Sequence, residues 1–194
     1  MRPAGSGGRI EPMTTIETAR VETPIGTLLL AARQGTLVAL DFGDRLDAQR
    51  RELERRFGPC LLEDRPDPAG AVGRLHAYFD GDVEAIDAVP ADPGGSVFQR
   101  KVWDELRRIR VGTTVSYSEL ARRVGAPRSV RAVGAANGRN PVAVVIPCHR
   151  VIGADGSLTG YGGGLDRKQW LLAHERAATP DGQGLLAIRR SLRL

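Results

Sequence analysis

The feature that most constrains the fold is a stretch rich in proline and glycine near the middle of the chain, VPADPGG at residues 89–95. Proline fixes φ and lacks an amide donor, and glycine has no side chain to pack, so such a stretch suits a connection better than the inside of a helix or strand. The 194 residues are enough for one large domain or two small ones. We therefore expect an N-terminal domain at residues 13–92, a linker at 93–96 and a C-terminal domain at 97–180.

The two halves of the chain also differ in charge. Residues 1–96 hold 11 Lys and Arg against 16 Asp and Glu, whereas residues 97–180 hold 14 against 6. A basic half favours a polyanionic partner, although a solvated basic surface accounts for the same charge equally well. Residues 1–12, rich in Gly, Pro and Arg, are expected to be a disordered tail, and residues 181–194 a basic tail.

Composition excludes several classes of protein. No apolar run reaches the ~18 residues of a membrane span, and the first residues lack the apolar core of a secretory signal. The two cysteines, Cys60 and Cys148, cannot make a disulfide framework or a four-ligand zinc set. We therefore expect no metal, no cofactor and a reducing, cytoplasmic compartment.

Turn signals and periodicity predict strands followed by helices in the first half. Gln34-Gly35 lies between two apolar runs, which is typical of a β-hairpin, and Gly58-Pro59 ends a charged helical pattern. The expected elements are a hairpin of residues 28–32 and 37–42 and helices at residues 45–57 and 70–80.

Four helix-start signals follow the linker, each with an N-cap residue ahead of an apolar helical pattern. The candidate N-caps are Ser96, Ser116, Ser129 and Asp166. Between the last two lies the β-branched run VAVVI at residues 142–146, which is short enough for one buried strand.

The second and third expected helices are separated by a four-residue break at residues 125–128, as in a helix-turn-helix. Any pair of packed helices gives this pattern, so the spacing alone does not identify a DNA-binding motif. Basic residues gather around the break: Arg122, Arg123, Arg128, Arg131 and Arg139.

The residues with the clearest chemistry are IPCHRV at positions 146–151. A cysteine is nucleophilic as its thiolate, and the adjacent His149 and Arg150 are groups that can lower the pKa of a thiol. Read from spacing alone, Cys148 is an inert buried thiol, a hydrolase-like nucleophile paired with histidine, or an acceptor of a transferred group. Cys60 has only apolar neighbours and proline beside it, so we interpret it as structural.

The motif PCHRV at residues 147–151 resembles the active-site signature of the O6-alkylguanine-DNA alkyltransferases, and other segments agree in order and spacing. RAVGAANGRNP at residues 131–141 resembles the recognition helix and asparagine hinge of that family, and VSYSELA at 115–121 the helix before it. GYGGGL at 160–165 resembles the active-site loop, and WLLAHE at 170–175 the closing helix. The resemblance covers roughly residues 97–176, and the first 95 residues match only loosely.

This resemblance implies an α/β protein of two domains. The N-terminal one is an α/β domain, ribonuclease H-like, and the C-terminal one is mostly helical with a winged helix-turn-helix. The implied function is DNA repair by single-turnover transfer of a methyl or larger alkyl group from O6-alkylguanine in double-stranded DNA to Cys148, after the nucleotide is flipped out through the minor groove. Whether O4-alkylthymine is also a substrate is left open.

The resemblance also implies roles for individual residues. A chain of hydrogen bonds from Cys148 through water to His149 and Glu175 makes the thiolate, Asn140 holds the hinge, and Tyr117 donates to N3 of the leaving guanine. An arginine fills the space left in the base stack. The implied DNA-binding residues are Ser129, Arg131 (the inserted arginine), Ala132, Gly134, Ala135 and Arg139. The implied base pocket comprises the carbonyls of Cys148 and Val151, with Tyr161, Gly162 and Gly163.

Two departures from the family pattern bear on function. Many relatives carry serine where this chain has Gly162, so only the backbone is expected to contact O6, and the glycine run is expected to loosen the loop and admit larger alkyl groups. Some relatives hold zinc in the N-terminal domain, but this half has only Cys60 and His76, so we expect none.

Two other functions remain open from the sequence, a non-catalytic helix-turn-helix module that binds DNA and a Cys–His hydrolase. We expect the protein to be a monomer in solution that associates with the nucleoid when it acts on DNA. Whether copies cluster along DNA is left open.

Overall fold

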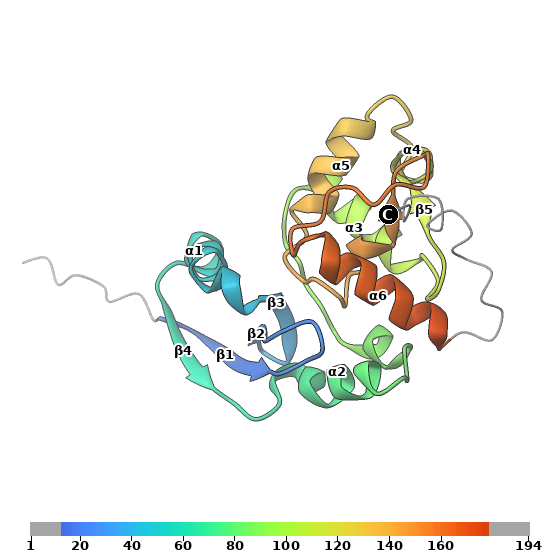
Figure 1. Cartoon of the computed structure of the whole chain (residues 1–194). Helices are drawn as coiled ribbons and strands as arrows, with labels where there is room; N and C mark the ends of the chain where they lie inside the picture. Colours follow the sequence, from blue (N-terminus) through green and yellow to red (C-terminus); the bar gives the residue numbers. More distant parts are fainter. Residues whose placement is uncertain (1–12, 179–194) are drawn as a thin grey trace, which may run out of the picture.

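The computed structural model describes residues 13–178. An N-terminal sheet unit is followed by a mostly helical C-terminal unit, and the two lie side by side (Figure 1). The predicted tails at residues 1–12 and 181–194 lie outside the described residues. Within residues 13–178, no helix is both long enough and apolar enough to span a bilayer.

The N-terminal unit is built on a four-stranded sheet with the strand order β3-β2-β1-β4. The strands are β1 (Thr14–Val21), β2 (Leu28–Arg33), β3 (Thr36–Phe42) and β4 (Cys60–Asp64). The first three pair antiparallel and β4 pairs parallel with β1. The predicted hairpin is confirmed, and its two turn residues, Gln34 and Gly35, have φ of 50° and 72°, which a tight hairpin turn requires.

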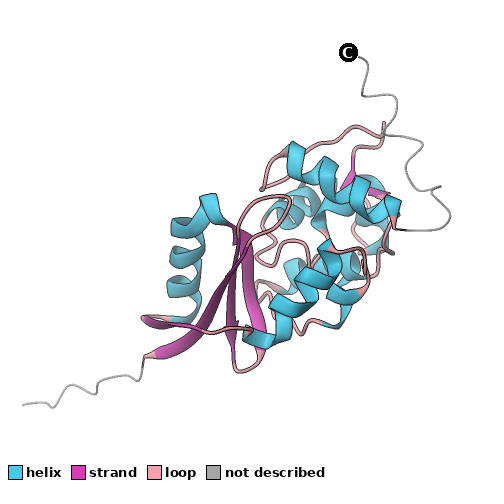
Figure 2. Cartoon of the chain, turned by 60° about the horizontal axis from the view of Figure 1, so that its bottom comes forward, coloured by secondary structure: helices cyan, strands magenta, loops and turns pink. Residues whose placement is uncertain are grey.

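Helices cover both faces of this sheet. On one face, α1 (Leu46–Phe57) buries Leu53 against a small core that includes Ile16 and Val38. The other face contributes Leu28, Leu30 and other alternate residues to the main core of the molecule. Figure 2 shows the sheet between α1 and the helices of the C-terminal unit. Both helices predicted in this half are confirmed, the second being α2 (Ala71–Phe79).

The C-terminal unit contains the four predicted helices, but one of the predicted caps, Asp166, is wrong. The helices are α3 (Val97–Arg107), α4 (Tyr117–Arg123), α5 (Val130–Gly138) and α6 (Leu165–Ala177). Ser96 forms a full capping box, and Ser116 accepts from the amide of Glu119. Ser129 is at the N-cap of α5 without a side-chain cap, and α6 starts after Gly164, so Asp166 lies within its first turn. There its carboxylate still faces the positive end of the helix dipole.

Residues 142–146 are buried as expected, but they do not form the predicted strand. One bridge joins Val142 to Leu40 of β3, and the chain then turns, with Val144 at φ 68°. This conformation is unfavourable for a β-branched residue. The amide of Val142 binds the side chain of Asn140, and that of Ile146 binds the carbonyl of Val142, so these donors are satisfied locally rather than in a ladder.

The two units share one hydrophobic core. It joins Leu28 and Leu40 of the sheet to Trp103 of α3 and Leu171 of α6. The proline-rich connection lies along the edge of β3, where Leu37 exchanges backbone hydrogen bonds with Pro90 and Asp92. The predicted domain limits stay a prediction, but this packing places the end of β3 beside the C-terminal unit.

Candidate active site

Cys148 begins a one-turn 3-10 helix, η4 (Cys148–Arg150), which leads into the short strand β6 (Val151–Ile152). Strand β6 pairs with β5 (Val115–Ser116), the strand before α4. The Cys148 side chain is 7% exposed and lines a cavity of about 30 Å³, room for about two water molecules. The cavity lies between the units, because its walls combine Phe42 and Arg45 with residues of the C-terminal unit: Asn137, Asn140, Tyr161, Gly162 and Gly163.

The Cys148 thiol is not a preformed thiolate. Burial raises its pKa above the usual value, although a hydrogen bond from Nδ2 of Asn140 to the sulfur (3.2 Å) favours the charged form. The expectation that Arg150 lowers this pKa is wrong, because its guanidinium is turned to Glu175. The thiol therefore needs a base to remove its proton.

His149, which follows Cys148 directly in the sequence, is the candidate for that base. Its side chain is fully buried, and Nε2 lies 2.8 Å from Oε1 of Glu175. Burial lowers the pKa of His149, so the ring is neutral near pH 7. Because the carboxylate accepts from Nε2–H, the proton-free nitrogen is Nδ1, which is buried and has no partner among the described residues.

Glu175 on α6 is fully buried and heavily hydrogen-bonded. Nε of Arg150 donates to Oε2 (2.9 Å) and Nη2 donates to Oε1 (2.8 Å), while Nη1 donates to the carbonyl of Ile109 (2.6 Å). Burial raises the pKa of Glu175, but His149 and Arg150 outweigh burial and hold it far below its usual range. The sequence prediction missed this role of Arg150; its place in an otherwise apolar run, CHRVI, was the available signal.

Asn140 connects the end of α5 to the turn that carries the cysteine. Its Oδ1 accepts from the amide of Val142 (3.0 Å), and its Nδ2 donates to the carbonyl of Ile146 (2.7 Å) as well as to the sulfur. These bonds hold both ends of the irregular segment around Val144.

We expect Asn140→Ala to lower the free energy of unfolding by about 1–3 kcal/mol, because it leaves the buried amide of Val142 without its partner. It also removes one of the two donors to the carbonyl of Ile146, which keeps its bond from the amide of Cys148. Chemical denaturation of the variant and the wild type measures this loss. Asn140→Asp is the comparison variant, since it keeps the acceptor for Val142 and replaces the donor with a charged oxygen that faces the carbonyl of Ile146. An Ala variant as stable as the wild type would contradict the role given to Asn140.

Two further polar residues, Lys168 and Asn137, were missed in the sequence because each lies inside an ordinary helical pattern. Nζ of Lys168 is buried and donates to the carbonyls of Val151 (2.6 Å) and Thr159 (2.7 Å), and burial lowers its pKa to about 8. Nδ2 of Asn137 donates to the carbonyl of Cys148 (3.4 Å). These residues fix the backbone at Cys148 and in the segment that follows it.

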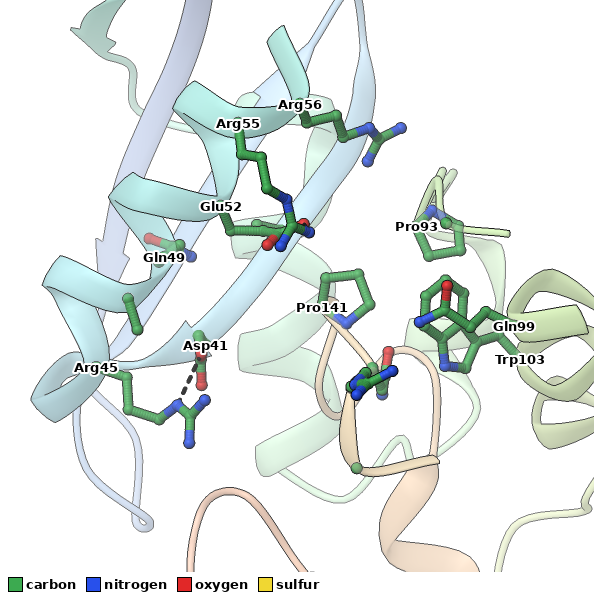
Figure 3. Close-up of a pocket in the computed structure, with 16 residues that line it drawn as sticks. Asp41, Arg45, Gln49, Glu52, Arg55, Arg56, Pro93, Gln99, Trp103 and Pro141 are labelled. Atoms are coloured by element: carbon green, nitrogen blue, oxygen red, sulfur yellow. Dashed lines mark hydrogen bonds and ion pairs between the residues drawn. The ribbon is translucent and has the colours of Figure 1, made fainter. Parts of the chain in front are cut away.

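The glycine-rich loop at residues 160–164 is held by the N-terminal unit, contrary to the expected looseness. Nη1 of Arg45 donates to the carbonyl of Gly162 (2.9 Å), and Arg45 is itself paired with Asp41 (3.0 Å; Figure 3). A Cβ on Gly163 would lie 2.1 Å from the Phe42 ring, so that position has room only for glycine. The loop forms one wall of the cavity that Cys148 lines.

The other residues predicted for the base pocket divide into two groups. Tyr161 lines the cavity beside Gly162 and Gly163, whereas Val151 is fully buried and does not line it. The Tyr117 hydroxyl lies 3.2 Å from the carbonyl of Gly160, to which it donates, and burial raises its pKa. Tyr117 therefore contacts the loop rather than the cavity.

The predicted recognition helix is α5, which follows α4 after a short turn. The side chains that it exposes are Arg131, Ala132, Ala135 and, just past its end, Arg139. Gly134 is half-buried, and a Cβ there would contact the Tyr117 ring at 3.8 Å. That distance is an ordinary van der Waals contact, so packing against α4 does not require glycine there. Ser129 is half-buried at the start of the helix.

A larger cavity of about 460 Å³ lies between α1 and residues 138–141 (Figure 3), but Cys148 does not line it. Its arginines Arg45, Arg55 and Arg56 are paired with carboxylates. Over residues 13–178, no group of three or more His, Cys, Asp or Glu could hold a metal. Cys148 lines only the smaller cavity of the two, and the paired His149 and Glu175 are buried beside it in the C-terminal unit without lining that cavity.

Two family models match the chain. The one described as 6-O-methylguanine DNA methyltransferase, DNA binding domain, matches residues 97–177. The one described as 6-O-methylguanine DNA methyltransferase, ribonuclease-like domain, matches residues 16–93.

Individual relatives agree with this match. The methylated-DNA–protein-cysteine methyltransferase of Mycolicibacterium paratuberculosis is 49% identical over 168 residues, which are 85% of this chain and 95% of the relative. A crystal structure of O6-methylguanine methyltransferase from Mycobacterium tuberculosis has a TM-score of 0.72 at 41% identity and covers 87% of this chain and 96% of that one. A structure of the protein from that organism in complex with DNA has a TM-score of 0.70 at 40% identity, covering 88% and 98%.

The two-domain α/β fold and the resemblance read from the sequence are thereby confirmed, and the chain belongs to the 6-O-methylguanine DNA methyltransferase family.

Proposed function

We propose that this protein repairs O6-methylguanine in DNA directly, by moving the methyl group to Sγ of Cys148. The observation that carries the proposal is the arrangement around the thiol. A buried cysteine lines a small cavity, next in sequence to a neutral histidine that has a proton-free nitrogen and a buried carboxylate partner. Family membership supplies the substrate.

The reaction is a displacement at the methyl carbon. Nδ1 of His149 takes the thiol proton, through a water molecule, and Glu175 stabilises the resulting imidazolium. The thiolate then forms the S–C bond while the C–O6 bond breaks and its electron pair goes to the guanine, which is protonated as it leaves. Tyr117 is proposed to donate to N3 of that guanine. The thioether product is a poor leaving group, so each chain acts once.

A guanine base is larger than the present cavity, so the loop at residues 160–164 has to move for the base to enter. The contacts of Arg45 and Phe42 with Gly162 and Gly163 are therefore expected to break and re-form around the base. Larger alkyl groups need a larger displacement of the same loop.

The exposed side of α5 is proposed to contact DNA in the minor groove, with Arg131 filling the space that the flipped nucleotide leaves. Arg131 is exposed, and no described residue pairs with it, so its guanidinium is available for this role. Every group in the proposed reaction comes from one chain, which supports action as a monomer.

We expect Arg131→Ala to slow transfer from duplex DNA by about tenfold to a hundredfold, because the flipped state loses the group that replaces base stacking. Transfer from the free O6-methylguanine base, which needs no flipping, is expected to stay unchanged. Arg139→Ala, which removes an equal charge just past the end of this helix, is the comparison: it is expected to weaken duplex binding without this loss in the rate of transfer from bound duplex. Duplex repair at the wild-type rate by the Arg131 variant would contradict this assignment.

The function itself is tested by incubating the protein with a duplex that carries one O6-methylguanine and measuring restored guanine by chromatography of the digested DNA. One guanine restored for each protein chain is the expected result. Binding without restoration would favour the DNA-binding module, and repeated turnover on an ester or amide would favour the Cys–His hydrolase.

A further inference from the structure

The Glu175 carboxylate has a hydrogen-bond donor from the other unit of the protein. The Tyr78 hydroxyl, on α2 of the N-terminal unit, donates to Oε1 of Glu175 at 3.0 Å. Both side chains are fully buried. The residues are 97 positions apart in sequence, so only docking of the two units brings them together.

We propose that Tyr78 is a positioning residue for alkyl transfer: from the N-terminal unit, its hydroxyl orients the Glu175 carboxylate and sets the basicity of His149. This inference rests on the function proposed above and extends its hydrogen-bonded chain across the boundary between the units.

The geometry around Oε1 supports this role. The same oxygen accepts from Tyr78, from Nε2 of His149 (2.8 Å) and from Nη2 of Arg150 (2.8 Å). The second oxygen, Oε2, accepts from Nε of Arg150 and lies 3.5 Å from the amide of Gly112. The Tyr78 hydroxyl and Nε2–H of His149 therefore donate to the same carboxylate oxygen.

Tyr78 is also held firmly in place. Its backbone carbonyl lies 2.7 Å from Nε2 of His174, the residue before Glu175, and its ring packs edge-on against the His174 ring at 5.1 Å. Burial raises the pKa of Tyr78 well above its usual value, so the hydroxyl keeps its proton and remains a donor. A fixed, permanently protonated donor is what positioning of the carboxylate requires.

The direction of the effect follows from charge. A donor to Oε1 withdraws negative charge from the oxygen that stabilises the imidazolium, so removing the donor raises the pKa of His149. The other charged or titratable groups near this pair remain in place when only the hydroxyl is removed. They are Arg150, which binds Glu175, Lys168, which lowers the pKa of His149, and Tyr161 and Cys148 on the cavity side.

The test is the pH dependence of single-turnover transfer by Tyr78→Phe under saturating duplex. Transfer needs neutral His149, so its rate falls on the acidic side of the profile. We expect the acidic limb of the variant to move to higher pH by about 0.5–1 unit, with a much smaller change at the alkaline plateau. Leu75→Val, on the same face of α2 and fully buried, is the control for lost packing and is expected to leave the limb in place.

A Tyr78→Phe limb that coincides with that of the wild type would overturn the inference, and so would an equal shift in Leu75→Val. Failure of the proposed function has a different signature. In that case the wild type itself leaves Cys148 unmodified at every pH.

Discussion

Replacing Cys148 with alanine is expected to abolish methyl transfer and to leave binding to duplex DNA unchanged. Cys148 is the thiol that lines the small cavity, and its sulfur is the atom that would form the new bond. The exposed face of α5 lies elsewhere on the C-terminal unit and is untouched by the substitution. Parallel measurements of transfer and of duplex affinity check both parts of this prediction.

Cys60→Ala is the matched control for Cys148→Ala. Cys60 lies on β4, at the sheet edge away from the active site, and its sulfur is 3.1 Å from the carbonyl of Gly58. This variant is expected to transfer at the wild-type rate. If Cys148→Ala still transferred the methyl group and Cys60→Ala did not, Cys60 would be the acceptor instead.

The second large effect is expected for Glu175→Gln. This substitution removes the only carboxylate that Arg150 contacts among the described residues, and it leaves the buried guanidinium of Arg150 without a counter-charge. We expect a loss of about 3–5 kcal/mol in the free energy of unfolding. Because the imidazolium of His149 also loses its stabilising charge, the transfer rate is expected to fall by about 10²- to 10⁴-fold. Denaturation and single-turnover kinetics measure the two effects separately.

The pH dependence of stability gives an independent check on Glu175. Its pKa in the folded protein lies far below the usual value of 4.5, so its contribution to stability is complete above pH 4.5 and is lost as the pH falls below that value. The wild type is therefore expected to lose its advantage over Glu175→Gln on acidification. A stability difference that stays constant from pH 7 to pH 3 would contradict the ion pair.

The sequence predicted most of the elements whose formation depends on residues close together in the chain. The hairpin, the helices and the segment around Cys148 each carry a turn, a cap or a motif that acts within a few residues. Residues 142–146 were predicted wrongly as a strand because β-branched composition indicates burial as much as it indicates pairing, and here the side chain of Asn140 binds the backbone instead.

Contacts between distant residues could not be read in the same way. Lys168 and Tyr78 look like ordinary helix residues in the sequence, and their partners lie 9 to 97 positions away. From the sequence, Arg150 is expected to lower the pKa of the neighbouring thiol, but in the fold its guanidinium binds a carboxylate 25 positions further along the chain. Of these contacts, the one between Tyr78 and Glu175 exists only after the two units have docked.

The most direct measurement is the mass of the proteolytic peptide that holds Cys148, taken after incubation with a duplex containing O6-methylguanine. We predict a gain of one methylene on that peptide, rising to one for each chain and no further when damaged DNA is in excess. An unmodified Cys148 peptide from protein that has restored the guanine would contradict transfer to this thiol.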